Sequence, residues 1–205
     1  MDGLRGPLIV HDPNSPYKGQ YDSEIVMYLS DWYHEQAAIA APQYVGKKYE
    51  YSYYDTSLIC LITAEVSLNP NDGSEPVPNS ALMNDQINPH FAVQPNKTYF
   101  LRIINLSGFA QFYLHIPGHN FTIIETDSIY THPTFAQDLY IANGQRYGVL
   151  LKTLPKTTQN YPILGTMDPN GFDPDAMAAV PDLQQNVTGA LVYDSKYLPT
   201  YDSCC

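Results

Sequence analysis

The stretch from Thr98 to Asn105 reads TYFLRIIN and has the composition of a β-strand, since aromatic and β-branched residues dominate it. The turn Gln94-Pro95-Asn96 precedes it. The stretch Glu24–Tyr33, EIVMYLSDWY, is apolar on both faces near its start, which indicates a strand buried between two layers. Only His34–Ala41, ended by Pro42, favours a helix. Further strands are expected at Leu4–His11, Phe112–Ile116, Phe121–Glu125, Leu139–Ile141, Arg146–Leu151, Tyr161–Thr166 and Ala190–Tyr193.

Short strands separated by turn signals at intervals of about ten residues indicate an all-β sandwich or barrel. The composition agrees, because the 205 residues include 18 Tyr and 17 Pro, which favour strands and turns over helices. At about 150 residues per domain, the length predicts a single domain spanning residues 1–205. The expected core comprises Trp32, Phe100, Ile103, Phe112, Ile123 and Val149.

The charge balance narrows the class of protein. The chain carries 10 Lys and Arg residues against 21 Asp and Glu, a formal net charge of −11. Binding to nucleic acid needs clustered basic residues, so this composition argues against it. Acidity fits a secreted protein or one that handles cations. No apolar run is long enough to span a membrane, and the opening MDGLRGPLIV lacks the pattern of a signal peptide.

Glycosylation sequons indicate the secretory route more clearly than the cysteines do. Cys60 lies in an apolar run and Cys204 and Cys205 are adjacent, so neither a zinc site nor a disulfide framework is expected. Four Asn-X-Ser/Thr sequons predict a secreted glycoprotein. Two of them fall in strand-like segments that leave little room for a glycan. The candidate glycosylation sites are Asn96, Asn186, Asn120 and Asn105.

No motif in the chain forms a catalytic centre on its own, and no GxSxG stretch is present. His115 and His119 have the spacing of two ligands on a helix, but Pro117-Gly118 lies between them. We therefore interpret His119 as a hydrogen-bonded turn histidine and not as a metal ligand. The carboxylate pairs are interpreted as solvated charges on loops. These pairs are Asp173 with Asp175 and Glu125 with Asp127.

Five stretches resemble, in the same order, the second plastocyanin-like domain of multicopper oxidases. They are DGLRGPLIVHDP (2–13), LSDWYH (29–34), VQPNKTYFLRIINLSGFAQFYLHIPGHNFTIIETDS (93–128), NGQRYGVLL (143–151) and PDLQQNVTGALVYD (181–194). The resemblance covers nearly the whole chain and is greatest to fungal iron-uptake ferroxidases and ascomycete laccase-like enzymes. It implies a cupredoxin-like Greek-key β-sandwich for residues 1–205.

In this family, three cupredoxin domains share four coppers. The copper ligands lie in HxHG and HxH motifs of the first domain and in HPxHLHG and HCHxxxH motifs of the third, and none of these motifs occurs here. The resemblance therefore implies copper in a parent oxidase, with no catalytic residue and no copper ligand in this chain. It further implies flanking domains 1 and 3 and an iron permease as partners, and an extracellular or cell-surface location.

The turn GSEPVP (73–78) resembles a ferroxidase turn whose glutamate helps to bind ferrous iron, which makes Glu75 the candidate iron-binding residue. Carboxylate oxygens suit such a cation. A second carboxylate of the family corresponds to Ala178 here, and Asp173 and Asp175 are offset from that place. A laccase-like oxidase of phenols or pigment precursors is therefore the alternative. A non-catalytic structural or binding domain with the same fold is a third possibility.

The stretch from Gly46 to Glu65, GKKYEYSYYDTSLICLITAE, exceeds the family's length by about twenty residues and has neither the alternation nor the turns of its neighbours. Possible codons for the residues at its two ends contain a splice donor at the start and a branch element with a splice acceptor at the end. We therefore hypothesise that residues 46–65 are a retained intron read in frame. The alternative is a true loop insertion with a strand at Leu58–Thr63. The start at Met1 within a matched stretch and the loss of resemblance after Ser203 also suggest a truncated gene model.

Overall fold

The computed structural model describes residues 4–36, 77–157, 159–180 and 182–193. Glu75, the stretch 46–65 and the three cysteines lie outside the described residues. Most of the described chain is β-structure, with one short α-helix. No helix among the described residues is long and apolar enough to cross a membrane.

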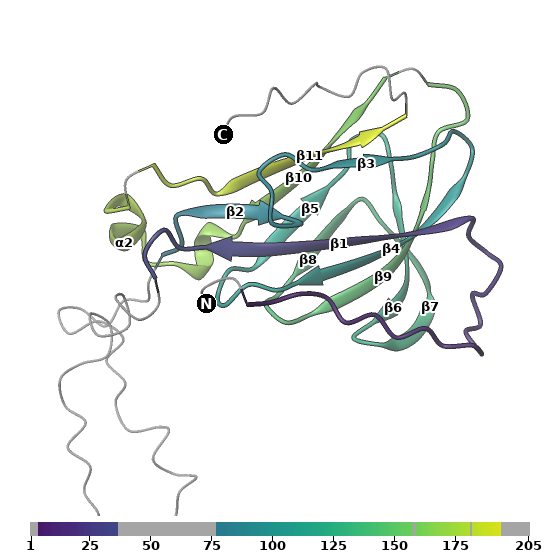
Figure 1. Ribbon diagram of the computed structural model, residues 1–205, viewed down its shortest axis with the longest axis horizontal. Coiled ribbons are helices and arrows are strands. Elements are labelled where there is room, and N and C mark those ends of the chain that lie inside the picture. Colours follow the sequence, from purple (N-terminus) through teal and green to yellow (C-terminus); the bar gives the residue numbers. More distant parts are fainter. Residues whose placement is uncertain (1–3, 37–76, 158, 181, 194–205) are drawn as a thin grey trace, which may run out of the picture.

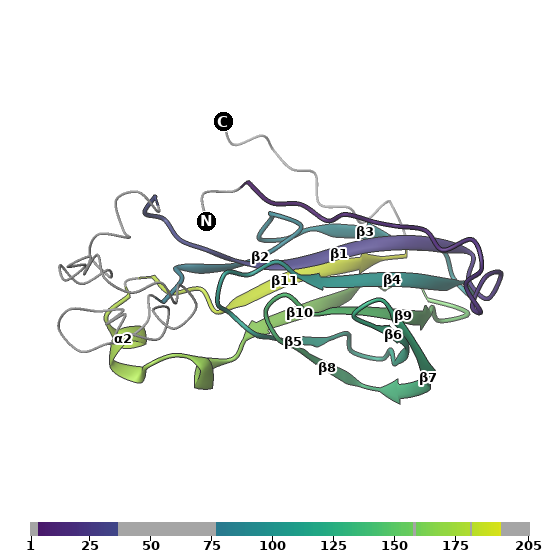
Figure 2. The ribbon, with the colours of Figure 1, turned by 90° about the horizontal axis from the view of Figure 1, so that it is seen from below.

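Two sheets pack face to face, as the two perpendicular views show (Figures 1 and 2). One sheet, called sheet A, has the strand order β2-β1-β4-β9-β6-β7, and sheet B has the order β3-β11-β10-β5-β8. Both sheets are mixed, since β1 runs parallel to β4 and β11 runs parallel to β3, whereas the other neighbours are antiparallel. The predicted β-sandwich is confirmed.

The strand bounds agree closely with the sequence pattern where that pattern is regular. The predicted strand at 98–105 is found without change, and the last strand begins four residues earlier than predicted. The strands are β1 (Ser23–Trp32), β2 (Ser80–Met83), β3 (His90–Ala92), β4 (Thr98–Asn105), β5 (Phe112–His115), β6 (Phe121–Thr126), β7 (Ile129–Ala136), β8 (Asp138–Ile141), β9 (Arg146–Lys152), β10 (Tyr161–Met167) and β11 (Asn186–Val192). The helical elements are η2 (Pro169–Gly171) and α2 (Pro174–Ala178).

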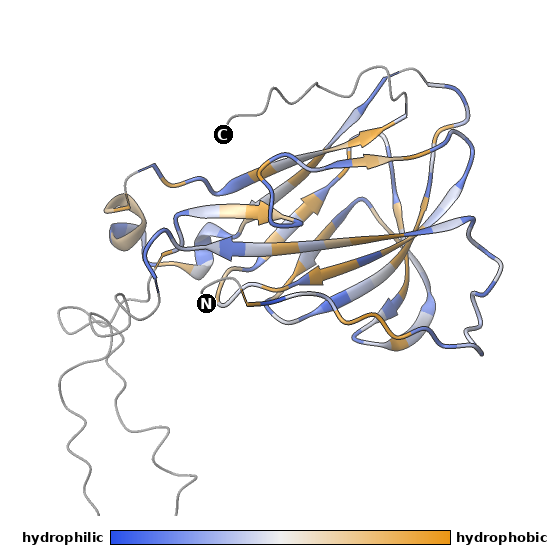
Figure 3. Cartoon of the chain, in the orientation of Figure 1, coloured by the Kyte–Doolittle hydropathy of each residue, from blue (hydrophilic) through white to orange (hydrophobic). Residues whose placement is uncertain are grey.

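The core lies between the facing sides of the two sheets, and hydrophobic residues are frequent along the strands that enclose it (Figure 3). Phe112, Ile103 and Val149 are fully buried, and Phe100 is 5% exposed. Ile123 is half-buried and packs against the core. The prediction was wrong for Trp32, which is half-buried at the end of β1. There the guanidinium carbon of Arg5 lies 5.6 Å from the centre of its ring.

The predicted strand at 4–11 is not formed. Instead this segment, here called the strap (residues 4–12), runs beside sheet A without joining its ladder (Figure 1). Pro7 interrupts it, because proline has no N–H to donate to a ladder. Leu4, Leu8 and Val10 are 76% to 100% exposed. Residues 34–36 of the predicted helix are non-helical, and residues 37–41 lie outside the described residues.

Candidate functional site

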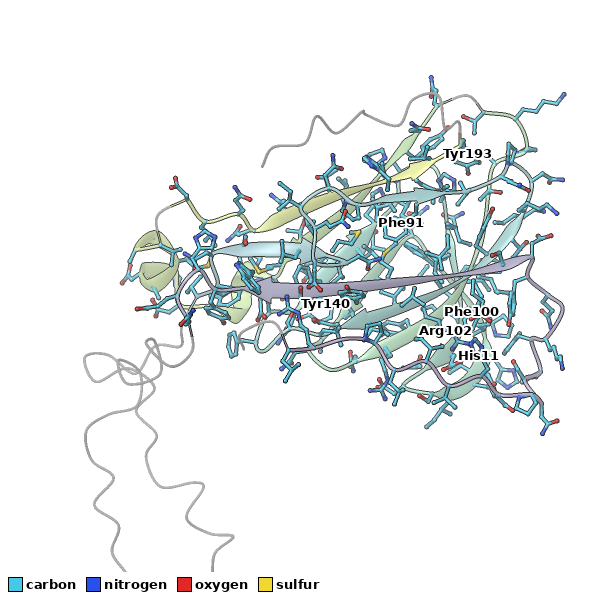
Figure 4. The ribbon with its side chains drawn as sticks, in the orientation of Figure 1. His11, Phe91, Phe100, Arg102, Tyr140 and Tyr193 are labelled. Atoms are coloured by element: carbon cyan, nitrogen blue, oxygen red, sulfur yellow. The ribbon has the colours of Figure 1, made fainter. Side chains whose placement is uncertain are left out.

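The strap contacts sheet A and its neighbours through the largely buried side chain of Arg5 and the exposed side chain of His11. Arg5 donates to the Ser30 hydroxyl at 3.0 Å and to a carboxylate oxygen of Asp85 at 3.0 Å. Further along, His11 Nδ1 lies 3.8 Å from Glu24, whose second oxygen accepts from Arg102 at 3.0 Å. The groove beneath the strap has a volume of about 590 Å³. Figure 4 shows His11 and Arg102 together at this face.

Glu24 is the central charge under the strap. Besides Arg102, it accepts a hydrogen bond from the Tyr21 hydroxyl at 2.8 Å. Burial opposes ionisation of this carboxyl, but the hydrogen bonds from Arg102 and Tyr21 outweigh it, so the pKa of Glu24 lies below its usual value. The guanidinium of Arg102 also lies over the Phe100 ring, with 4.5 Å between its carbon and the ring centre. These contacts hold Glu24 and Arg102 in an ion pair on sheet A, facing the strap.

The end of the sandwich that carries α2 is the candidate functional site, because Val77, two residues after Glu75, and the segment around Ala178 both lie there (Figure 1). Asn79 ties three segments together at this end. Its N–H donates to the Trp32 carbonyl at 2.9 Å, and its side-chain oxygen accepts from the N–H of His34 at 2.9 Å. Its carbonyl accepts from the N–H of Gln184 at 2.8 Å. Val77 is buried, so the chain that follows Glu75 is anchored in the core.

A cleft of about 580 Å³ opens at this end of the molecule. Two carboxylates line it, Asp85 and Asp182. Asp85 is already paired with Arg5 and accepts from the Tyr28 hydroxyl at 3.0 Å. Asp182 is exposed and has a φ of 57°, the left-handed region that asparagine and aspartate tolerate. No group of three or more metal-ligating side chains occurs within the described ranges.

Helix α2 accounts for Asp173 and Asp175, the two aspartates that precede Ala178 in the sequence. Asp173 is its N-cap, accepting from the N–H of Asp175 at 2.9 Å and from that of Ala176 at 3.0 Å. Asp175 lies in the first turn, where the helix dipole favours negative charge. Both aspartates are exposed, as interpreted from the sequence, and Asp173 in addition caps the helix. Ala178 ends the helix and is exposed.

The opposite end of the sandwich holds His119, which is 5% exposed. Its Nδ1 lies 3.1 Å from the Pro117 carbonyl and its Nε2 lies 2.6 Å from the Tyr193 hydroxyl. The Tyr193 oxygen also accepts from the N–H of Leu154 at 2.9 Å. Burial lowers the pKa of His119, so the neutral ring is favoured. Both ring nitrogens are occupied, which confirms the interpretation as a hydrogen-bonded turn histidine.

Sequence reasoning did not single out the buried carboxylate of Asp31. Asp31 is 3% exposed and accepts from three backbone N–H groups, those of Gly108 at 2.9 Å, Phe109 at 2.8 Å and Ala110 at 3.1 Å. This holds the Phe109 ring 5.4 Å from that of Phe172, the residue before the N-cap of α2. Asp31 therefore positions the loop that supports the candidate site. A charged residue inside an apolar strand was the available signal.

Comparison with known proteins decides the family. The model of the multicopper oxidase family matches residues 23–195. The chain belongs to the multicopper oxidase family. It is 44% identical over 195 residues to the iron transport multicopper oxidase FET3 of Gibberella zeae, covering 95% of this chain and 27% of the relative. It is 43% identical over 199 residues to the iron transport multicopper oxidase fetC of Epichloe festucae, covering 97% of this chain and 28% of the relative.

Solved structures agree with the multicopper oxidase assignment. The crystal structure of Fet3p, a multicopper oxidase that functions in iron import, matches with a TM-score of 0.75 and 32% identity over 96% of this chain and 32% of that chain. A laccase from Botrytis aclada matches with a TM-score of 0.63 at 22% identity over 90% of this chain and 31% of that one, which shows the shared fold alone. The expected cupredoxin-like Greek-key fold is confirmed. The chain spans about 27% of the length of the curated relatives it matches.

Proposed function

We propose that this chain is the middle domain of a longer copper-dependent oxidase that oxidises ferrous iron and reduces oxygen to water. The observation that carries the proposal is the 44% identity to an iron transport multicopper oxidase over 95% of the chain. Because the chain covers only 27% of that relative, the activity is assigned to the longer protein. That protein acts outside the cell or at its surface, with an iron permease as partner.

The strap supports the presence of a flanking domain. Its outward face consists of Leu4, Leu8 and Val10, which are all highly exposed. Scattered exposed apolar residues are common, but three on one face of an extended segment without ladder partners suit a contact with another domain. Flanking cupredoxin domains 1 and 3 would supply such a surface.

Copper does not fit the described part of this chain. Neither ring nitrogen of His119 is free, and His115 Nδ1 lies 2.7 Å from a carboxylate oxygen of Asp138. A copper site needs several imidazole and thiolate donors converging on one point, and the described residues form no such group. In the proposal the coppers therefore belong to the flanking domains. This chain contributes the spacing between them and a loop on the substrate side.

Glu75 is the proposed ligand for ferrous iron as substrate. It lies outside the described residues, but the chain resumes two residues later at Val77, next to Asn79, which binds the end of β1 and the segment after α2. Val77 and Ala178 therefore lie at the same end of the sandwich. One carboxylate where the resembling ferroxidases have two should bind the cation more weakly, since affinity follows the number and charge of the oxygen ligands.

In the longer protein, Glu75→Ala should lower kcat/KM for ferrous iron by about tenfold or more, equivalent to about 1.4 kcal/mol of transition-state stabilisation. Oxidation of phenols should change less, because neutral phenols gain little from a carboxylate. Steady-state oxygen consumption with each substrate measures both constants. Asp138→Asn, a change at an exposed carboxylate outside the cleft, is the control and should leave both nearly unchanged. Equal losses on iron and phenols would favour the laccase-like alternative.

A gain-of-function variant completes this experiment. Ala178→Asp should lower the KM for ferrous iron, because it restores a second carboxylate at the exposed end of α2. Ala179→Asp is the matched control, since residue 179 is also exposed but one position further along. An equal fall in KM in both variants would indicate a general effect of negative charge. A fall only in Ala178→Asp would indicate a specific iron site.

A non-catalytic binding or structural domain is the remaining alternative. It is distinguished by the coding sequence on either side of this chain. Copper-ligand motifs of the HxHG type upstream and the HCH type downstream support the oxidase. Their absence on both sides would leave a cupredoxin-fold domain without the copper chemistry of its relatives.

A further inference from the structure

We propose that Asn96, Asn120 and Asn186 carry N-linked glycans, whereas Asn105 is a structural amide that is never modified in the folded protein. The proposal rests on the secretory location of the proposed function. All four residues begin an Asn-X-Ser/Thr sequon. Their side chains nevertheless differ sharply in burial and hydrogen bonding, and a bulky hydrated glycan is compatible only with the exposed ones.

Asn105 is fully buried at the end of β4. Its Nδ2 donates to the Ala110 carbonyl at 2.9 Å and to the Ile141 carbonyl at 3.2 Å. Its Oδ1 accepts from the N–H of Ser107 at 2.9 Å. Both hydrogens on the nitrogen that would carry the sugar are therefore used, and Ser107 itself is 7% exposed. A glycan at Asn105 would break these bonds and open the core.

Asn96 and Asn120 have the opposite surroundings. Both are exposed, and neither side chain has a hydrogen bond to another described residue. Asn96 lies in the turn before β4 with a φ of 56°, and Asn120 follows the turn that contains His119. The acceptor nitrogen of each therefore faces solvent at a point where the backbone bends away from the sheets.

The two turns lie at the same end of the sandwich. The N–H of Asn96 donates to the Leu154 carbonyl at 3.1 Å, and the N–H of Leu154 donates to the Tyr193 oxygen. The Tyr193 hydroxyl in turn contacts His119, the neighbour of Asn120. Figure 4 places Tyr193 at the end opposite α2. Two glycans here would keep this end in water, away from contact with a flanking domain.

Asn186 is the first residue of β11 and is exposed. Its Oδ1 accepts from the Thr166 hydroxyl at 2.8 Å, an arrangement that fixes the amide and leaves Nδ2 for the sugar. Thr188, which completes the sequon, is exposed as well. Because alternate residues of a strand share a face, Asn186 and Thr188 both point away from the core. This part of the outer face of sheet B is therefore also expected to remain in water.

The test is site occupancy in the 205-residue chain exported from a yeast host behind a cleavable leader. Peptide N-glycosidase converts each occupied Asn to Asp, and mass spectrometry of the peptides reads each site separately. We expect conversion at Asn96, Asn120 and Asn186 and none at Asn105 in the exported chain. Conversion at Asn105 in chain that melts cooperatively, or no conversion at the other three, would overturn the inference.

Single variants provide a second readout. Each single variant should lose one glycan and therefore migrate faster on a gel by one band, and the thermal melting of the deglycosylated chain should stay unchanged. The variants are Asn96→Gln, Asn120→Gln and Thr188→Val. Thr188→Val is the matched control for Asn186, because it destroys the sequon without altering the acceptor. Occupied sites in a longer protein that fails to oxidise ferrous iron would refute only the proposed function. Unoccupied sites in an exported, active protein would refute only this inference.

Discussion

Replacing Asp31 with alanine should lower the free energy of unfolding by about 3 to 4 kcal/mol, because three backbone N–H groups lose their shared acceptor. Ala110 is 1% exposed, so its N–H cannot turn to water without opening the loop. The loop should then release Phe109 from Phe172 and loosen the base of α2. Urea unfolding followed by tryptophan fluorescence measures the change, since Trp32 lies next to the altered residue.

Two further variants separate this effect from a general loss of charge. Asp31→Asn keeps one carbonyl oxygen but turns an NH₂ group toward the donors, so an intermediate loss is expected. Asp138→Ala removes a carboxylate that is 66% exposed and bound to His115, and it should cost less than about 1 kcal/mol. A loss for Asp31→Ala no larger than that for Asp138→Ala would contradict the role assigned to the buried carboxylate.

Truncating Ile103 to alanine should cost about 2 to 5 kcal/mol, the range for removing a large buried aliphatic side chain and leaving a cavity. Ile103 is fully buried in β4, a central strand that pairs with both β1 and β9. The surrounding strands cannot collapse into the space without breaking their ladders. The free energy of unfolding from a denaturant titration checks the value.

Graded and matched variants test the cavity explanation. Ile103→Val removes one methylene group and should cost about 0.5 to 1.5 kcal/mol. Ile129→Ala is the surface control, because Ile129 is 70% exposed in β7, and it should change stability by less than about 0.5 kcal/mol. A loss that does not increase from Ile103→Val to Ile103→Ala would contradict the placement of Ile103 in the core.

The regular strands were predictable from sequence because burial alone determines their pattern. β4 and β9 are central strands, so their apolar residues follow the pleat and turn residues mark their ends. β7 was missed because it is an edge strand, exposed at nearly every position and containing Pro133. Only its pairing with β6 makes it a strand. β2 and β3, which are four and three residues long, were also missed.

The tertiary contacts of the candidate site could not be predicted in the same way. Asp31 and the loop it binds are 77 to 79 residues apart, and no local pattern connects them. The strap has the alternation of a strand but lies beside sheet A without pairing, and Leu4, Leu8 and Val10 are exposed. Apolar residues that pack against no other described residue are expected where a segment contacts another domain. Glu75 and Ala178, by contrast, were found through resemblance to a family.

The central claim is that copper chemistry resides in the flanking domains of a longer oxidase and not in this chain. Titration of the purified 205-residue chain with copper, followed by visible absorption, tests it most directly. Type 1 copper needs a cysteine thiolate with two histidines, and the described residues bring no such donors together. We predict that no intense blue band appears at any copper concentration. An intense blue band that saturates at one copper per chain would contradict the account.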